Sequence, residues 1–142
     1  MRRRAFLLLP AVSLAAAIRP GAAYAFANTL IGVFRDGDPI HRGSGWCVIQ
    51  KPVHPDIQTA LHMHEMEVVP GPNLHVYLVK EPDPLFPEDV TAAFFSLGRL
   101  KSLTGSQTYP IPPEAHDFEW GSVVVWCETF ETAFAVATLK QR

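Results

Sequence analysis

The sequence predicts an all-β fold, a small antiparallel β-sandwich or a barrel-like domain. Short apolar runs alternate with turn segments, and the 142-residue chain contains 9 glycines and 13 prolines to make those turns. Residues 57–64 show the period-two alternation of a half-buried strand. After residue 25 no pattern supports a long helix. Many short strands separated by tight turns are typical of sandwiches and barrels.

The first two strands are expected before residue 52. Residues 30–34 form a short apolar run, and it stops at residues 35–39, which carry the Asp, Gly and Pro of a turn. Residues 40–51 fit a second strand. Pro52 and Pro55 close it, because proline cannot continue a central strand.

The third and fourth strands are expected to form a hairpin. Residues 57–64 place one set of side chains on a buried face and another on a polar face. The Pro-Gly-Pro-Asn segment at 70–73 predicts a reversal, after which residues 74–78 return alongside the third strand. The predicted buried face consists of Thr59, Leu61 and Met63.

The second half of the domain continues the same pattern. Residues 81–87 contain three prolines and predict a loop, and residues 102–107 predict a further turn region. Residues 90–97 fit a short helix or a strand, and the pattern leaves both open. Residues 122–139 are apolar enough for two consecutive strands, of which 123–127 is the most β-prone piece of the chain.

The N-terminus predicts a cleaved export signal over residues 1–25. A basic start is followed by an uncharged apolar stretch over residues 5–18, which is too short to span a bilayer. Ala23 and Ala25 form a small-residue cleavage site, so we expect the mature protein to begin near Phe26. The predicted location is therefore periplasmic or secreted.

Two arginines raise the question of the export route. Arg3 and Arg4, followed by an apolar pair, fit the twin-arginine pattern, and Arg19 places a positive charge before the cleavage site. The alternative is an ordinary export signal that begins with three arginines. The twin-arginine route carries folded proteins, often with a cofactor, so it weakly favours a bound cofactor.

The charge of the expected mature domain limits its partners. Removing residues 1–25 removes four arginines and no acidic residue, which lowers the formal net charge from −2 to −6. An acidic surface repels phosphate backbones, so nucleic-acid binding is not expected, and a basic partner protein is favoured. Residues 26–142 are of a length that makes one domain, and they contain no apolar run of membrane length.

The two cysteines, Cys47 and Cys127, have three alternative fates. In an oxidising compartment the plainest is a mutual disulfide. The second is a functional thiol at Cys127, which could transfer electrons or ligate a metal or haem. The third is an inert buried thiol, since cysteine is among the most buried residue types. The sequence leaves the three open.

A histidine-rich strand face suggests metal binding. His62 and His64 share the polar face of the third predicted strand, and His75 would approach them if the next strand returned alongside. Imidazoles on one face could hold copper or zinc. The alternative is a solvated face that happens to be rich in histidine. The chain has no nucleophile elbow, zinc-protease motif or phosphate loop, so stand-alone catalytic turnover is not expected.

Several ordered segments together resemble the DM-thirteen domain family, called the electron-transfer DM-thirteen family. The resemblance spans about residues 32–139, nearly all of the predicted mature chain. Its closing segment contains Trp126 and Cys127, and the specificity comes from the order and the intervals of the segments together. The segments that carry the resemblance are His41 with Gly45, 71–78, 97–101, 105–112 and 123–137.

The resemblance implies an all-β, extracytoplasmic domain whose signature cysteine matches Cys127. That cysteine is then expected to act as a redox thiol or as the ligand of a prosthetic group, haem or a metal ion, in electron transfer with a partner protein. Cys47 has no counterpart in the family pattern, and a bond between the two cysteines would occupy the redox sulfur. The competing hypothesis is a non-catalytic binding or structural module with a disulfide or a buried thiol. The residues expected around a cofactor at Cys127 are His41, His75, Tyr77 and Tyr109.

Overall fold

The computed structural model describes residues 26–52, 54, 56–116 and 119–142. This part of the chain is mostly β-structure, as predicted, with one short α-helix and one 3-10 helix. The strands are β1 (Phe26–Asp36), β2 (Gly43–Pro52), β3 (Thr59–Val68), β4 (Leu74–Val79), β5 (Phe94–Arg99), β6 (Thr104–Ile111), β7 (Ser122–Cys127), β8 (Thr132–Thr138) and β9 (Lys140–Gln141). The helices are α3 (Pro87–Thr91) and the 3-10 helix η2 (Pro113–Ala115).

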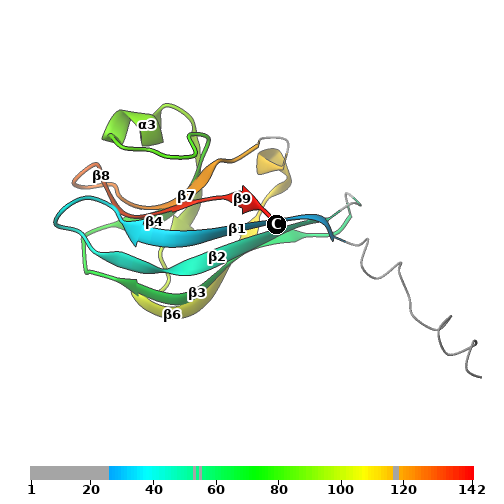
Figure 1. Ribbon diagram of the computed structural model, residues 1–142, viewed down its shortest axis with the longest axis horizontal. Coiled ribbons are helices and arrows are strands. Elements are labelled where there is room, and N and C mark those ends of the chain that lie inside the picture. The colour runs from blue at the N-terminus through cyan, green and yellow to red at the C-terminus, as the bar shows by residue number, and fades with distance from the viewer. Residues whose placement is uncertain (1–25, 53, 55, 117–118) are drawn as a thin grey trace, which may run out of the picture.

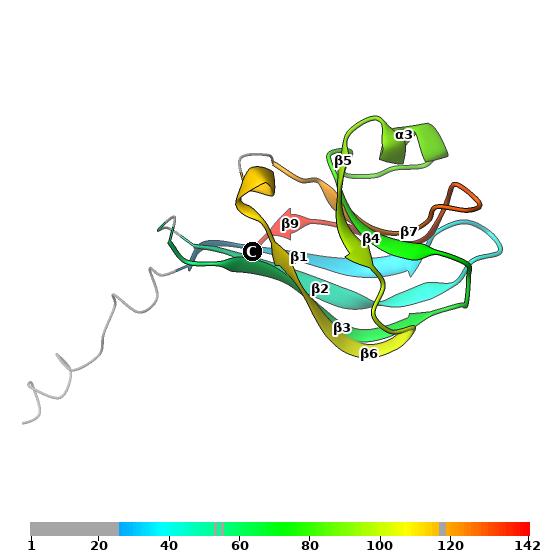
Figure 2. The same ribbon diagram turned by 180° about the vertical axis from the view of Figure 1, so that it is seen from behind.

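The strands form one antiparallel sheet that curls into a nearly closed barrel (Figures 1 and 2). Its strand order is β5-β4-β7-β8-β1-β2-β3-β6, and the short β9 pairs with β1. The two strands at the ends of this order, β5 and β6, follow one another in the chain. Figure 2 shows β5 running down from the layer of β4 and β7 towards β6 in the opposite layer. Of the two architectures that the sequence allowed, the barrel is the one formed.

Most of the expected strands are confirmed, and two segments differ. The predicted turn region at 102–107 is wrong, because β6 begins at Thr104 and pairs with β3. The segment at 90–97 is divided between both alternatives: α3 ends at Thr91 and β5 begins at Phe94. Residues 122–139 form the two predicted strands, β7 and β8, which pair with each other.

The expected hairpin between the third and fourth strands is wrong. Both edges of β3 are occupied, one by β2 and the other by β6. Strand β4 instead pairs with β5 and β7. The turn at 70–73 therefore does not fold β4 back onto β3 but carries the chain across the end of the barrel. Asn73, at φ 60°, takes the left-handed conformation that asparagine tolerates in turns.

The hydrophobic core has an inner and an outer part. The inner cluster fills the barrel and includes Leu61, Met63, Cys127 and Phe134. The outer cluster lies where α3 covers the outside of β4, β7 and β8, and Val90 is the buried contribution of α3 (Figure 1). Strand β7 is consequently buried on both of its faces, with all six residues inaccessible. Within the part of the chain that the structure describes, neither helix has the length and apolar character needed to cross a membrane.

A bulge between β2 and β3 adjusts which side chains enter the core. The register shifts between Ser44 and Trp46, opposite a positive-φ residue, Glu65, in β3. Gly45 lies here at φ 122°, and a Cβ on it would lie 2.8 Å from the His64 carbonyl oxygen. The alternation predicted for residues 57–64 is confirmed from Thr59, where β3 begins, and after the bulge Met66 enters the core.

Candidate functional site

Strand β7 places Cys127 at one end of the barrel, at its last residue. Its backbone neighbours are Leu74 of β4 and Thr132 of β8. The Glu128 N–H donates to the Asn73 carbonyl at 3.1 Å, which holds the residues after Cys127 against the 70–73 turn. The position of the thiol is thus fixed by three separate segments of the chain.

The thiol of Cys127 is fully buried and hydrogen-bonded. Its S–H donates to the Pro72 carbonyl at 2.9 Å, and its sulfur accepts the Phe130 N–H at 3.4 Å. Its exposed fraction is 0%. A sulfur with these contacts is held in one orientation, and a bulky reagent cannot reach it without movement of the chain.

The other side of β7 carries an aromatic stack. Trp126 lies outside the barrel, where its ring stacks with Tyr77 of β4 at a centroid distance of 6.0 Å. Phe94 of β5 stacks on the same tyrosine at 4.4 Å, with an interplanar angle of 12°. Cross-strand pairing explains the arrangement, because β4 lies between β5 and β7 and Tyr77 is central.

Polar side chains surround the edge of this stack. The Tyr77 hydroxyl donates to Glu128 Oε2 at 2.7 Å. His75 Nε2 lies 3.2 Å from Glu128 Oε1 and 3.0 Å from Asn73 Oδ1, so this nitrogen carries the hydrogen and donates. Asn73 Nδ2 donates to Glu128 Oε1 at 3.3 Å. We refer to Asn73, His75, Tyr77 and Glu128 as the Glu128 cluster.

Two groups of the Glu128 cluster have unusual surroundings. Burial, the hydrogen bond to Glu128 and the negative charge of that carboxylate together raise the pKa of Tyr77 above its ordinary value. His75 Nδ1 is buried and has no hydrogen-bond partner among the described residues. The cluster therefore keeps the tyrosine hydroxyl protonated and aimed at a carboxylate.

His41 lies at the same end of the barrel as Cys127, and Phe134 lies between His41 and the turn that holds Cys127. Its ring stacks on Phe134 at 4.0 Å, and its Nδ1 lies 2.7 Å from Asp38 Oδ2. A Cβ on Gly71, in the turn that holds Cys127, would lie 2.4 Å from the Phe134 ring. Partial burial raises the pKa of Asp38, but hydrogen bonds from His41 and Ile40 outweigh it and lower the pKa overall.

Tyr109 belongs to a separate network. Its hydroxyl donates to Gln107 Oε1 and accepts the Lys101 N–H at 2.8 Å. Burial raises its pKa, and the Lys101 N–H opposes that change. Of the four residues expected around Cys127, the structure places His75 and Tyr77 in the neighbouring Glu128 cluster, His41 beyond Phe134, and Tyr109 in β6.

The three histidines of the predicted metal face are not brought together. His62 and His64 lie on the same face of β3, but His75 is in β4, which does not pair with β3. His62 Nδ1 lies 3.0 Å from Thr108 Oγ1, and His64 stacks on Trp46 at 4.3 Å. Over the described ranges, no group of three or more His, Cys, Asp or Glu side chains could hold a metal ion.

Of the three fates that the sequence left open for the cysteines, the Cys47–Cys127 disulfide is not formed, and both residues are free buried thiols. Cys47 lies in β2 between Gly32 of β1 and Met63 of β3. In the sheet, β8 and β1 separate β2 from the strand of Cys127. Burial raises the pKa of Cys47 to about 12, although the Gly32 N–H opposes the change. A thiol in this state is inert at neutral pH.

A haem fits poorly at Cys127. The sulfur contacts the Pro72 carbonyl and the Phe130 N–H, and the rest of the side chain packs in the inner cluster. A macrocycle bound axially to this sulfur would have to displace buried core side chains. Of the two roles expected for Cys127, the geometry favours a redox-active thiol over a ligand of haem.

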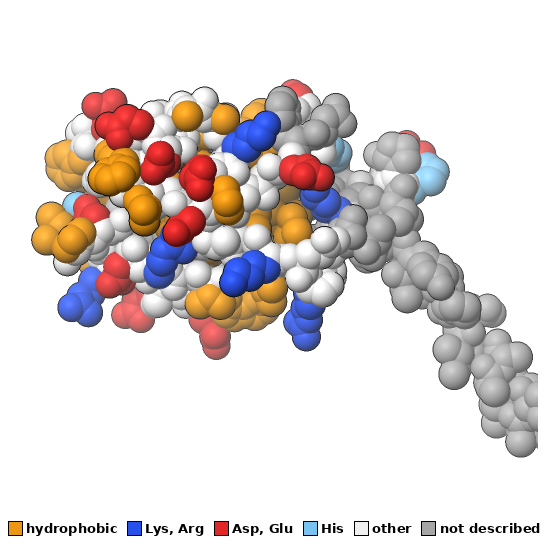
Figure 3. Space-filling view, turned by 45° about the horizontal axis from the view of Figure 1, so that its top comes forward, with side chains coloured by type: hydrophobic (Ala, Val, Ile, Leu, Met, Phe, Trp, Pro, Cys, Tyr) orange, Lys and Arg blue, Asp and Glu red, His pale blue; other side chains and the backbone are white. Residues whose placement is uncertain are grey.

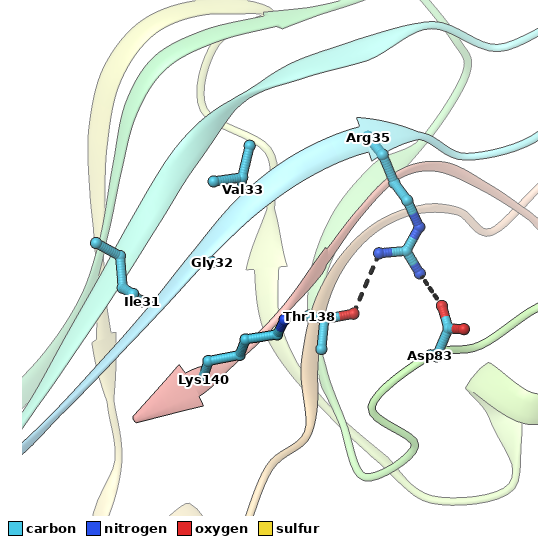
Figure 4. A pocket seen from close by; sticks show the side chains of 7 residues that line it. All are labelled: Ile31, Gly32, Val33, Arg35, Asp83, Thr138 and Lys140. Atoms are coloured by element: carbon cyan, nitrogen blue, oxygen red, sulfur yellow. Dashed lines mark hydrogen bonds and ion pairs between the residues drawn. The ribbon is translucent and has the colours of Figure 1, made fainter. Parts of the chain in front are cut away.

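An open hollow of about 570 Å³ lies elsewhere, on β1, β8 and β9. Figure 4 shows that its one arginine, Arg35, donates to Thr138 and pairs with Asp83. The guanidinium is thus already satisfied within the chain. This hollow shares no residue with the Glu128 cluster and is not part of the candidate site.

Several residues of the site were not among the predicted ones. Glu128 directly follows the signature cysteine, and Trp126 precedes it, so their closeness along the chain was a usable signal. Their contacts with Tyr77 depend on the pairing of β4 with β7, which no local pattern indicates. Phe94 could not be predicted because it lies in residues 90–97, for which the sequence pattern did not decide between helix and strand.

Comparison with known proteins gives one match. A family model described as "Electron transfer DM13" matches residues 37–139, which include strands β2 to β8 but not β1 or β9. No curated protein and no solved structure matches the chain. The matched region includes every residue of the Cys127 environment and of the Glu128 cluster.

Proposed function

Because the chain belongs to the electron transfer DM13 family, we propose that it is an exported electron-transfer domain with Cys127 as its redox centre. The position of Cys127 in the structure is the observation that supports the choice of this sulfur. Cys127 is the last residue of β7, on the face opposite the Trp126–Tyr77 stack, and it lies within the region that matches the family. Cys47 is the less suitable sulfur, because it lies in mid-strand and its pKa is raised to about 12.

The burial of Cys127 favours electron transfer over group transfer. Thiol–disulfide exchange requires a partner sulfur to reach the attacking thiol, and an inaccessible side chain prevents this. An electron needs no such contact. Oxidation of the thiol would break its S–H bond and pass one electron to an oxidised partner and one proton to solvent. The S–H donates to the carbonyl of Pro72, an exposed residue. Reduction by a partner would return both.

The surface at this end of the barrel suits a basic partner with an apolar contact patch. Hydrophobic side chains gather at the left end in Figure 3, with acidic ones among them, and Figure 1 places the β7–β8 turn at this end. Trp126, Leu85 and Phe86 line a small hollow here. Exposed apolar patches of this kind commonly mark interaction sites, and acidic side chains steer a basic partner towards them. The exposed hydrophobic residues of the loops and of β5 are Ile40, Leu85, Phe86, Phe94 and Phe130.

A second candidate function is a structural or binding module without redox activity. It is favoured by the hydrogen bonds of Cys127, which join β7 to the 70–73 turn and to the residues before β8. A thiol with these contacts could simply fasten three segments together. The two functions make opposite predictions for a redox measurement.

Voltammetry of the exported protein adsorbed on an electrode distinguishes them. We expect a reversible response in the wild type and in Cys47→Ala, and its loss in Cys127→Ser. Circular dichroism checks that each variant keeps its β-structure. A folded Cys127→Ser that retains the wild-type response excludes Cys127 as the redox centre, and a wild type with no response supports the structural module.

A further inference from the structure

We propose that Tyr77 is a second redox site, a tyrosine that gives up an electron while its proton passes to Glu128. The inference rests on the proposed electron-transfer function, which it extends with a residue that carries the electron between the surface and β7. Two independent observations support it: the hydrogen bond between Tyr77 and Glu128, and the stack of aromatic rings on both sides of Tyr77.

The first is the hydrogen bond between Tyr77 and Glu128. The hydroxyl lies 2.7 Å from Glu128 Oε2, a distance typical of a charge-assisted bond to a carboxylate. Tyr77 is only 4% exposed, so its proton has a built-in acceptor where water has little access. A tyrosine in this setting can lose its proton at the moment it is oxidised, which removes the cost of forming a buried radical cation.

Glu128 is held in place for this task by its other oxygen. Glu128 Oε1 accepts from His75 Nε2 at 3.2 Å and from Asn73 Nδ2 at 3.3 Å. These donors fix the carboxylate so that Oε2 faces the tyrosine.

The second observation is the continuous stack across three strands. Phe94, 41% exposed, contacts the inner Tyr77 ring face to face, and Tyr77 stacks in turn with Trp126. Trp126 is the chain neighbour of Cys127. The stack therefore joins an exposed ring to the strand that ends at the proposed sulfur centre, with the oxidisable tyrosine in the middle.

Oxidation of Tyr77 sends its electron and its proton to different acceptors. A one-electron, metal-centred oxidant at the surface takes one electron from Tyr77. The O–H bond of the tyrosine breaks, its proton forms a new O–H bond on Glu128 Oε2, and a neutral tyrosyl radical results. Return of an electron from a reduced partner, with the proton from Glu128, restores the hydroxyl and the carboxylate.

The test uses photo-oxidation of the exported protein by a flash-generated ruthenium(III) polypyridyl complex, with electron paramagnetic resonance to identify the radical. Tyr24 lies within the expected signal, so the exported protein contains two of the three tyrosines of the chain, Tyr77 and Tyr109. Tyr109→Phe is the matched control, since Tyr109 is also buried but donates to the neutral amide of Gln107. We expect a tyrosyl radical in Tyr109→Phe and none in Tyr77→Phe.

Glu128→Gln tests the route of the proton. The side chain is partly exposed, and the amide keeps its size, so the variant should fold. Loss of a positioned base should slow radical formation by roughly 100-fold or more. The solvent hydrogen isotope effect on the wild-type rate should change in the same variant. A radical on Tyr109 in the protein that contains both tyrosines, or an unchanged rate in Glu128→Gln, overturns the proposal.

Cys127→Ser separates this inference from the proposed function. If Tyr77 acts as proposed, the tyrosyl radical forms in Cys127→Ser as well, because its oxidation needs only the surface oxidant and Glu128. Failure of the Cys127 assignment would appear in voltammetry and leave the Tyr77 radical intact. Failure of the tyrosine relay would leave the voltammetric loss in Cys127→Ser intact and give no radical at Tyr77.

Discussion

Trp126 and Cys127 are consecutive residues whose side chains lie on opposite faces of β7. The tryptophan belongs to the outer cluster beneath α3, and the thiol belongs to the inner cluster of the barrel. Both are almost fully buried. One strand thus supplies an aromatic ring to one layer and a sulfur to the other, and substitutions at the two positions can be tested separately.

The thiols should be free but protected in the folded protein. Both cysteines are buried and unpaired with each other, so alkylation under native conditions should leave them unlabelled. Denaturation without a reductant should then allow two labels per chain. Intact mass measures both states. A protein that takes no label after denaturation, and is lighter by two hydrogens, would contain the disulfide.

Serine should be tolerated better at position 127 than at position 47. A serine hydroxyl at 127 can keep the hydrogen bond to the Pro72 carbonyl. At 47 the thiol lies among apolar groups in mid-strand, where a hydroxyl donor is costly. We expect Cys47→Ser to lower the unfolding free energy by about 1–3 kcal/mol, and Cys127→Ser by less. Urea unfolding measures both, and equal losses would contradict the prediction.

The contribution of Asp38 should depend on pH. Its folded-state pKa lies below the ordinary value of 3.8, so folding favours the carboxylate. The stabilisation is present above that value and is lost as the pH falls through the lower, folded-state pKa. Asp38→Asn should therefore be destabilised relative to wild type at neutral pH, and the difference should shrink in acid. Unfolding curves at several pH values test this, with Asp56→Asn as an exposed control.

Gly71 should be intolerant of alanine because of Phe134. A Cβ at this position would lie 2.4 Å from the Phe134 ring, so Gly71→Ala should cost roughly 1–3 kcal/mol of unfolding free energy. In a Phe134→Leu background the same change should cost less, since the ring is gone. The coupling in this double-mutant cycle should be about 0.5–3 kcal/mol. Additive effects would show that another contact causes the loss.

Export should depend on the paired arginines. If the twin-arginine route is used, replacing Arg3 and Arg4 with lysine should retain the precursor in the cytoplasm, while replacing Arg2 should not. Immunoblotting of cell fractions measures this, and intact mass should place the start of the exported protein near Phe26. Unchanged export in the double variant would indicate the general route.

Local patterns were sufficient for many elements of the fold. Alternation in residues 59–64 and the β-prone run 123–127 predicted β3 and β7, because a half-buried or fully buried strand leaves a direct trace in its own side chains. Residues 102–107 looked like a turn because Ser, Gly and Thr are common there. Pairing with β3 made most of that segment a strand.

The candidate site was harder to predict than its central residue. The resemblance to the family indicated Cys127, and a short-range argument could reach Trp126 and Glu128 beside it. The metal face depended on β3 pairing with β4, and that assumption failed because β6 takes the free edge of β3. Likewise, Tyr77 meets Glu128 only because β4 pairs with β7, a long-range choice that turn chemistry does not specify.

The position of the β7–β8 hairpin has a consequence for biosynthesis. These strands come late in the chain, yet they fill the gap between β4 and β1, which are made much earlier. A nascent chain that ends before β7 lacks the strands that cover the facing edges of β4 and β1, and unpaired strand edges invite aggregation. The barrel can close only once β7 and β8 have been made, so its folding rate is governed by contacts distant in sequence.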